Sequence, residues 1–163
     1  MLSESVKKQS KQIFQNIKIL FDSIPEEEFK TIKGGFPTWK HFYHLIHSID
    51  KNFINPNSFQ EPTFHQKNMD IIYMESGKKL SKKELEKYYQ QVKSKIQKYF
   101  NSLTDSTLEE VVSYKELKLT KMELILAQFR HIFYHVGYLH CCIKIEKGQT
   151  PEYIGIYKSI PEK

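Results

Sequence analysis

Residues 121–143, KMELILAQFRHIFYHVGYLHCCI, are the stretch from which the fold of this chain can be inferred. Apolar side chains recur in it every three or four residues, which is the period of an amphipathic α-helix. His131 and His135 lie four residues apart, so a helix places both imidazoles on one face and on neighbouring turns. Leu124 and Tyr138 fall on the same face. The pattern therefore predicts a helix whose two histidines point into the protein.

Two inward-facing imidazoles need polar partners, because desolvating a polar group without a partner costs about 1 to 3 kcal/mol. Each ring can bond to a nearby carbonyl or hydroxyl group, which is the commoner arrangement for a bare HxxxH spacing. Alternatively, both rings can bind one metal ion, which then needs a third ligand from elsewhere in the chain. The pair alone therefore supports only a hypothesis of a metal site.

The length and composition of the chain predict one soluble domain that spans residues 1–163. A chain of this length can bury a substantial core, and no apolar run approaches the ~18 residues of a membrane span, so no membrane partner is expected. The N-terminus lacks the features of a secretory signal. Cys141 and Cys142 are adjacent in the predicted helix, where a mutual disulfide would be strained. Free thiols favour a cytoplasmic location.

The net charge of +6 raises the question of a nucleic-acid partner. Lysines are spread through the helical stretches with acidic residues between them, and helix-turn-helix, zinc-finger and base-stacking motifs are missing from the sequence. We therefore expect no nucleic-acid partner. A basic surface can instead attract a small anionic substrate. A homodimer formed through an exposed helix face remains an open alternative.

Three further stretches have a helical period. Apolar spacing predicts helices over residues 3–22, 38–54 and 81–103, and Thr38 is the expected N-cap of the second. Ser81 and Glu84 form the pattern of a capping box at the start of the third.

The connections between these helices differ in length. Thr120 is the expected N-cap of the helix that carries the histidine pair, and this helix is expected to end near Lys147. Residues 104–118 predict a turn of helix and a short extended piece. Residues 55–79 have no clear period and predict a long, partly ordered connection with a helical turn near residues 69–73. The chain is therefore expected to be all-α, a four-helix bundle with a long crossover between helices 2 and 3.

The second predicted helix can supply the third metal ligand, because bundles build metal sites from side chains on facing helices. It carries three histidines, at His41, His44 and His47. At about 100° per residue, His44 lies roughly opposite the apolar seam of this helix, whereas His47 lies at its border.

Two motifs carry a resemblance to a known family. In the second helix the motif is Tyr43-His44 followed by Asp50 and Phe53, and in the fourth it is Arg130-His131-xxx-His135-x-Gly137-x-Leu139. With the order and lengths of the four helices, they make nearly the whole chain similar to the DinB-like superfamily, which includes YfiT-type metal proteins and bacillithiol- or mycothiol-dependent enzymes. The resemblance implies a divalent metal, zinc or nickel, held by His44, His131 and His135.

The identity of the ligand on the second helix has an alternative. Some members of the family place a tryptophan eight residues before the ligand and an aspartate three residues after it, as Trp39 and Asp50 stand to His47. The Tyr-His pairing favours His44, whereas the phase and the tryptophan spacing favour His47. We place His44 first and keep His47 as the alternative ligand.

The function that the resemblance implies is the transfer of a low-molecular-weight thiol, of the bacillithiol type, to an electrophilic substrate at a three-histidine metal site. The alternatives are a metal-dependent hydrolase and a non-catalytic, stress-related binding or dimerisation module. Asp50 is a candidate acceptor that orients a ligand imidazole. Arg130 is a candidate for binding a substrate carboxylate, with a surface role as the alternative.

The remaining histidines and the tryptophan have simpler expected roles. His41, and whichever of the two alternative ligands binds no metal, are expected at the surface or as capping groups. Trp39 is expected in the core. His65 and His140 are assigned no role.

Overall fold

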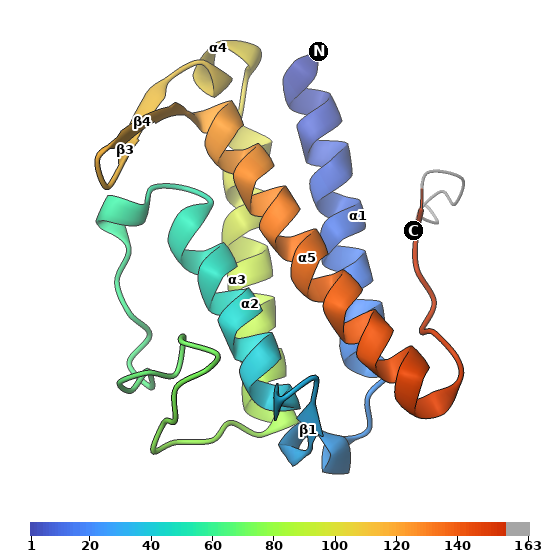
Figure 1. Ribbon diagram of the computed structural model, residues 1–163. Helices are drawn as coiled ribbons and strands as arrows, with labels where there is room; N and C mark the ends of the chain where they lie inside the picture. The colour runs from blue at the N-terminus through green and yellow to red at the C-terminus, as the bar shows by residue number, and fades with distance from the viewer. Residues whose placement is uncertain (156–163) are drawn as a thin grey trace.

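The structure is a computed structural model that describes residues 1–155 (Figure 1). Its α-helices are α1 (Leu2–Asp22), α2 (Thr38–Asn52), α3 (Lys82–Ser102), α4 (Asp105–Leu108) and α5 (Lys121–Lys147). Short 3₁₀ helices, η1 (Glu26–Lys30) and η2 (Pro56–Ser58), follow α1 and α2. Two antiparallel hairpins complete the fold: β1 (Ile32–Lys33) with β2 (Phe36–Pro37), and β3 (Val111–Tyr114) with β4 (Leu117–Thr120). The prediction of a mostly helical fold is confirmed, whereas the two hairpins were not predicted.

The four long helices pack along one another. Helix α1 contacts α3 and α5, and α2 contacts the same two helices from the other side. The apolar seams that the sequence predicted meet in one core, which includes Phe14, Ile17, Phe42, Ile49, Ile96, Phe100, Ile132 and Leu139. Because α2 lies against α5, side chains from these two helices can meet although 68 residues, 53–120, lie between the helices in sequence.

Side-chain caps explain where two of the long helices begin. Ser81 and Glu84 form a complete capping box at the start of α3, and Thr120 and Glu123 form another at the start of α5. Both predicted N-caps are therefore confirmed. The prediction for α2 is wrong by one residue: Thr38 is already helical, and its hydroxyl donates to the carbonyl of Thr31 instead of capping the helix.

The start of α1 is held by a residue that is about 100 positions away in sequence. The Asp105 carboxylate accepts hydrogen bonds from the backbone N–H of Leu2 (3.1 Å) and Ser3 (2.8 Å) and from the Ser3 hydroxyl (2.6 Å). A carboxylate at a helix N-terminus satisfies unpaired N–H groups and interacts favourably with the helix dipole. Helix α4 thus caps α1.

The β1–β2 hairpin brings a tight turn against α5. Gly34 and Gly35, between the two strands, both have positive φ, at 57° and 89°. The hydroxyl of Tyr138, on α5, donates to the Gly34 carbonyl at 2.5 Å. A Cβ atom at Gly34 would overlap that hydroxyl oxygen and the ring that carries it. The turn therefore needs glycine at position 34 for two reasons, its backbone conformation and the approach of the tyrosine.

The extended piece expected between the third and fourth helices belongs to the β3–β4 hairpin. Val111 pairs with Thr120 and Tyr114 with Leu117. At the turn, Lys115 adopts a positive φ of 55°. A lysine in this conformation is uncommon, and the turn has no glycine or asparagine that would have predicted a hairpin.

The crossover, residues 53–81, connects α2 to α3 and runs down the left-hand side of Figure 1. Apart from η2 it consists of turns, so the helical turn expected at residues 69–73 is not formed. Polar side chains on successive turns of α2 bind it along its length, by the pairs Lys40 with the Met74 carbonyl, Tyr43 with His65, His44 with the Asp70 carbonyl, and His47 with Glu61. The crossover is therefore ordered mainly by contacts with α2.

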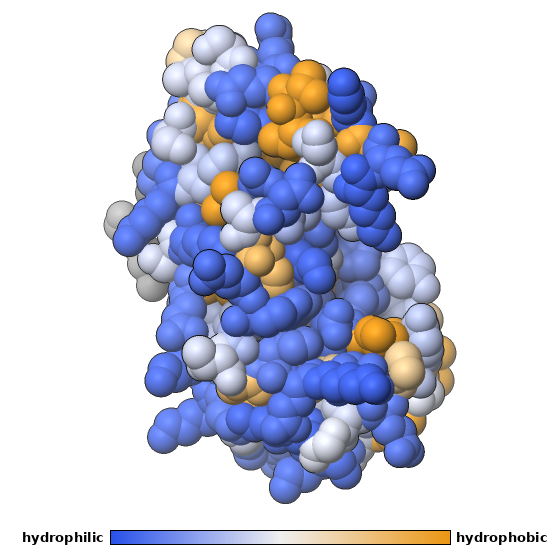
Figure 2. All heavy atoms as spheres, turned by 90° about the vertical axis from the view of Figure 1, so that its left-hand side faces the viewer, coloured by the Kyte–Doolittle hydropathy of each residue, from blue (hydrophilic) through white to orange (hydrophobic). Residues whose placement is uncertain are grey.

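Within the described residues, 1–155, no helix has both the length and the apolar character needed to cross a bilayer. The face that includes the crossover is largely hydrophilic, with scattered apolar side chains (Figure 2).

Candidate metal centre

Three histidines from two helices converge where α2 packs against α5. His44 comes from α2, and His131 and His135 lie one turn apart on α5. One nitrogen from each ring lies within 4.8 Å of the others. The ring centroids of His131 and His135 are 4.6 Å apart. The centroid of His44 lies 4.7 Å from that of His135 and 5.4 Å from that of His131. We call His44, His131 and His135 the triad.

The orientation of His44 is set by the crossover. Its Nδ1 donates a hydrogen bond to the backbone carbonyl of Asp70 at 2.6 Å. Because a carbonyl oxygen can only accept, Nδ1 carries a proton, and in the neutral ring Nε2 is left with a lone pair. Fixing one nitrogen through a hydrogen bond while the other stays free is how proteins usually orient a metal-binding histidine.

The two histidines of α5 are in an environment that disfavours protonation. Burial, together with the neighbouring His44 and His131, lowers the pKa of His135 to about 3. Burial, followed by the effect of His44, also lowers the pKa of His131. In addition, Nε2 of His131 is buried without a hydrogen-bond partner among the described residues. Both rings are therefore neutral at physiological pH and offer lone pairs.

These residues fit a divalent metal ion. Metal–nitrogen distances of about 2.1 Å place the nitrogens of a tetrahedral site about 3.4 Å apart, so the three rings, now within 4.8 Å of one another, need to draw slightly closer. An imidazole-only set suits zinc, nickel, iron or copper. It also accounts for the buried Nε2 of His131, which has no hydrogen-bond partner among residues 1–155.

The triad is reachable from the solvent. His44 and His131 are half-buried, and only His135 is buried, with 6% of its surface exposed. The ring of Tyr134, 67% exposed, lies edge-on to that of His135 at 5.2 Å. An exposed aromatic ring beside the three imidazoles offers a surface on which a small molecule can pack.

The structure brings His44 to the α5 pair and places His47 elsewhere. His47 is buried and its Nε2 donates to a carboxylate oxygen of Glu61 in the crossover, at 2.6 Å. His65 stacks on the His47 ring at 5.2 Å and completes a second group of possible ligands, whose atoms also lie within 4.8 Å of one another. His65 was assigned no role from the sequence. The sequence signal for this cluster was weak: Glu61 and His65 lie in a connection without a helical period, which follows the helix that carries His47.

The proposed role of Asp50 in orienting a ligand needs correction. Its carboxylate accepts hydrogen bonds from the Tyr88 hydroxyl (2.9 Å) and the Lys95 ammonium group (2.6 Å), both on α3. Asp50 therefore links α2 to α3, and the Asp70 carbonyl orients His44 instead. Arg130 is exposed and forms no ion pair within the described part of the chain, so it is free to meet a ligand.

Two expectations about histidines at the surface are also wrong. His41 is 1% exposed, and its Nε2 bonds to the carbonyl of Lys33 at 2.9 Å. His47, the alternative ligand that does not belong to the triad, is buried as well. Both rings face elements that follow or precede α2, namely the crossover and β1, which the helical period of α2 does not reveal. Trp39 lies in the core as expected.

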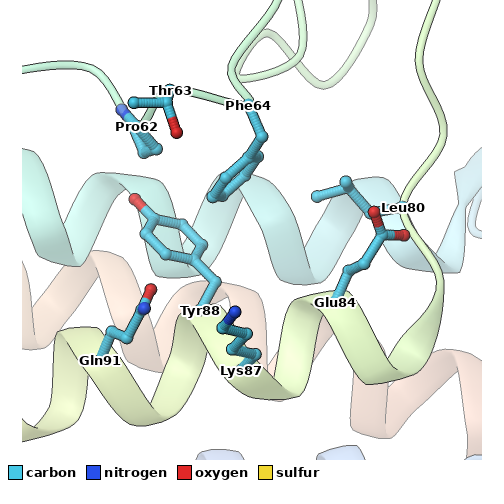
Figure 3. Close-up of a pocket in the computed structure, with 8 residues that line it drawn as sticks. All are labelled: Pro62, Thr63, Phe64, Leu80, Glu84, Lys87, Tyr88 and Gln91. Atoms are coloured by element: carbon cyan, nitrogen blue, oxygen red, sulfur yellow. The ribbon is translucent and has the colours of Figure 1, made fainter.

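A cavity of about 390 Å³ lies between the crossover and α3, away from the triad (Figure 3). The rings of Phe64, from the crossover, and Tyr88, from α3, meet edge to face at its wall, 5.2 Å apart. None of the three triad histidines lines it. The cavity is therefore a separate feature of the crossover and does not belong to the candidate metal centre.

Of two comparisons with known proteins, one gave a match. Comparison with curated proteins gave no match. A sequence model of the DinB superfamily matches residues 10–139, a span that includes the whole triad, all of α2 and the part of α5 up to Leu139. This match covers most of the chain, and the protein therefore belongs to the DinB superfamily.

Proposed function

We propose that this protein is a metal-dependent enzyme in which His44, His131 and His135 hold one divalent ion, zinc or nickel. We further interpret the four long helices as the four-helix bundle, with a long crossover between α2 and α3, of a single domain over residues 1–163. The observation that carries the proposal is the convergence of three imidazoles within 4.8 Å. The Nε2 of His131, buried and without a hydrogen-bond partner in the described part of the chain, supports it.

The chemistry available at such a site follows from its ligands. A divalent ion held by three imidazoles keeps open positions, and it lowers the pKa of a water molecule or thiol that it binds. The protein's own groups then bind and orient the reactants. His44 is held by the Asp70 carbonyl, and Tyr134 offers an exposed ring beside His135. The exposed guanidinium of Arg130 can bind a carboxylate.

The reaction that we place first is the transfer of a low-molecular-weight thiol to an electrophile, because the DinB-like resemblance includes thiol transferases. In this reaction a bond forms between the thiol sulfur and an electrophilic carbon, the leaving group departs from that carbon, and the thiol proton passes to solvent. The net charge of +6 favours an anionic thiol. Cys141 and Cys142 are both free, which suits a reducing cytoplasm.

Metal analysis tests the first half of the proposal. Protein purified without a histidine tag is expected to hold about one zinc or nickel ion per chain at the triad, and His135→Ala is expected to lose it, since removing one of three ligands leaves an incomplete site. His140→Ala is the matched control, because it removes an imidazole from the same helix that contacts Tyr153 instead. Wild-type protein whose metal content equals that of His135→Ala would sink the proposal.

An activity screen tests the second half. The metal-loaded protein is incubated with bacillithiol, or another bacterial thiol, and a panel of electrophiles, and the conjugates are detected by mass spectrometry. Conjugation by wild-type protein and by His140→Ala, but not by His135→Ala, supports thiol transfer. Hydrolysis of an electrophile without conjugation would replace transfer by the alternative reaction at the same site.

A further inference from the structure

A second group of possible metal ligands lies one turn along α2 from the triad. It consists of His47 on α2 and of Glu61 and His65 in the crossover, and we call it the crossover cluster. The Oε2 atom of Glu61 lies 2.6 Å from Nε2 of His47 and 3.7 Å from Nδ1 of His65. The three ligand atoms are within 4.8 Å of one another, as in the triad, but no residue is shared between the two groups.

The donor set of the crossover cluster suits a divalent cation. Two imidazoles and one carboxylate are the ligands of several metal sites with open positions. Because the carboxylate is negative, the cluster attracts a cation more strongly than three imidazoles do. Lys51 lies 3.7 Å from the other oxygen of Glu61, Oε1, so Oε2 remains on the side of the two histidines.

The surroundings of His65 and His47 provide the support that metal ligands need. The Asp70 carboxylate lies 3.8 Å from Nε2 of His65, where an acidic group can orient a ligand imidazole. His47 is only 3% exposed, and burial, partly opposed by the hydrogen bond to Glu61, lowers its pKa. Burial also raises the pKa of Tyr43, whose hydroxyl is hydrogen-bonded to Nδ1 of His65 at 2.6 Å.

Binding of a cation exchanges hydrogen bonds for ligation. The Nε2 proton that His47 donates to Glu61 has to leave to solvent, and the Tyr43 hydroxyl has to turn away from Nδ1 of His65. Release of protons on binding is a general property of histidine metal sites. The exposed side of Glu61 gives the ion a path of entry, since its side chain is 43% exposed.

We propose that His47, Glu61 and His65 form a second site for a divalent cation, separate from the triad, and that the ion cross-links the crossover to α2. The crossover has no long helix or strand of its own and depends on α2 for its order. An ion bound to one α2 residue and two crossover residues fixes the segment between Phe59 and Asp70. The proposal does not depend on the function proposed for the triad.

Zinc binding to four proteins tests the second site. After removal of metal and titration with zinc, the wild-type chain is expected to bind two ions, and Glu61→Gln one. Glutamine keeps the size of the side chain and a hydrogen-bond acceptor for His47 but removes the charge. Glu116→Gln, an exposed change at the β3–β4 turn, is the matched control and is expected to bind two. His135→Ala, which disrupts the triad, is expected to bind one.

The outcomes separate the two sites. A wild-type chain that binds only one ion, which both Glu61→Gln and His135→Ala lose, would overturn the second site. Equal zinc content in Glu61→Gln and Glu116→Gln would overturn it as well. If Glu61→Gln does not fold, His65→Gln takes its place with the same expected stoichiometry. Loss of the triad ion alone, with zinc still bound by His135→Ala, leaves the second site standing even if the function proposed for the triad fails.

Amide hydrogen exchange distinguishes a metal site from a cluster that is only structural, because only a metal site changes its exchange rate when zinc is added. In the His135→Ala background, zinc is expected to slow amide exchange in residues 59–70 by about tenfold or more, since a ligand at saturating concentration stabilises the closed segment. Exchange in the β3–β4 hairpin, residues 111–120, should not change. Equal exchange in residues 59–70 with and without zinc would contradict the proposal.

Discussion

His135 is the histidine whose titration is most strongly changed by the fold. Its pKa is lowered to about 3 by burial and by the neighbouring imidazoles, whereas in the unfolded chain a histidine titrates near pH 6.5. Below that pH the unfolded chain binds a proton that the folded, metal-free protein does not bind. The free energy of unfolding therefore decreases as the pH falls from about 6.5 toward 3.

We expect the urea midpoint of metal-free wild-type protein to be lower at pH 5 than at pH 7. One fully shifted imidazole accounts for about 2 kcal/mol over this range. His135→Gln should show a smaller decrease, because it lacks this imidazole. Some decrease should remain, because the other histidines with lowered pKa are still present: His41, His47, His131 and His140. An equal decrease in both proteins would show that His135 titrates alike in its folded and unfolded states.

Gly34 is a second residue with a testable role. Gly34→Ala forces a side chain into a backbone with φ of 57° and against Tyr138, whose hydroxyl oxygen and ring already occupy the position that the new Cβ atom would take. Gly35→Ala shares the positive φ, at 89°, but its Cβ meets nothing within 4 Å. Strain alone costs about 1 to 3 kcal/mol, so Gly34→Ala is expected to lose clearly more stability than Gly35→Ala in urea denaturation. Equal losses would mean that the tyrosine yields without cost.

At the scale of elements, the hydrogen bonds from the start of α1 to Asp105 make the stability of α1 depend on α4. Hydrogen bonds from Ser3, first through its hydroxyl and then through its backbone N–H, lower the pKa of Asp105. A carboxyl group whose pKa is lower in the folded protein stabilises the fold at pH values above its pKa in the unfolded chain, near 3.9. This contribution is lost as the pH falls through the pKa of the folded protein. Asp105→Asn removes the charge that α1 meets at its N-terminus.

We therefore expect Asp105→Asn to have a lower melting temperature than wild type at pH 7, and the difference to shrink as the pH approaches 2. Glu109→Gln is a matched control, since it removes an exposed carboxylate beside α4 without touching α1. A difference between Asp105→Asn and wild type that stays constant from pH 7 to pH 2 would argue against the charge as its cause.

The elements that sequence predicted well are those with local signals. The capping boxes at Ser81 and Thr120 involve residues three apart, so both helix starts could be predicted from a few letters. The β3–β4 hairpin turns at Lys115 in a conformation that lysine rarely adopts, and therefore gave no signal. The crossover takes its path from contacts with α2, which no period within residues 55–79 could reveal.

The candidate metal centre was likewise predictable only where its signal was local. The HxxxH spacing predicted that the two imidazoles of α5 share a face, because both lie on one helix. The Tyr43-His44 pairing favoured His44, whereas the apolar seam of α2 and the tryptophan spacing favoured His47, and the seam describes only what α2 buries in the core. The crossover and α5 cover two further faces of this helix, and position on those faces decides which histidine reaches the triad.

At the scale of the whole molecule, an ion in the triad would join two helices from distant parts of the chain. A ligand present at about 100 times its dissociation constant stabilises the folded state by about 2.7 kcal/mol. For a domain of this size, that corresponds to a rise of about 5 to 10 °C in melting temperature. Scanning calorimetry is expected to show at least this rise when nickel is added to metal-free wild-type protein and to His140→Ala. The rise in His135→Ala is expected to be smaller by this amount, because only the crossover cluster can bind the ion in that variant. An identical rise in all three proteins would place the stabilising ion outside the triad.

The bond that holds His44 also bears on how the protein can change during evolution. Its acceptor is the backbone carbonyl of Asp70, and every amino acid supplies the same carbonyl. Drift in the side chain at position 70 therefore leaves the triad intact, whereas an insertion or deletion in the crossover moves the carbonyl away from the ring. Among relatives that keep this arrangement, we expect the length of the segment between residues 44 and 70 to be constrained more tightly than the identity of residue 70.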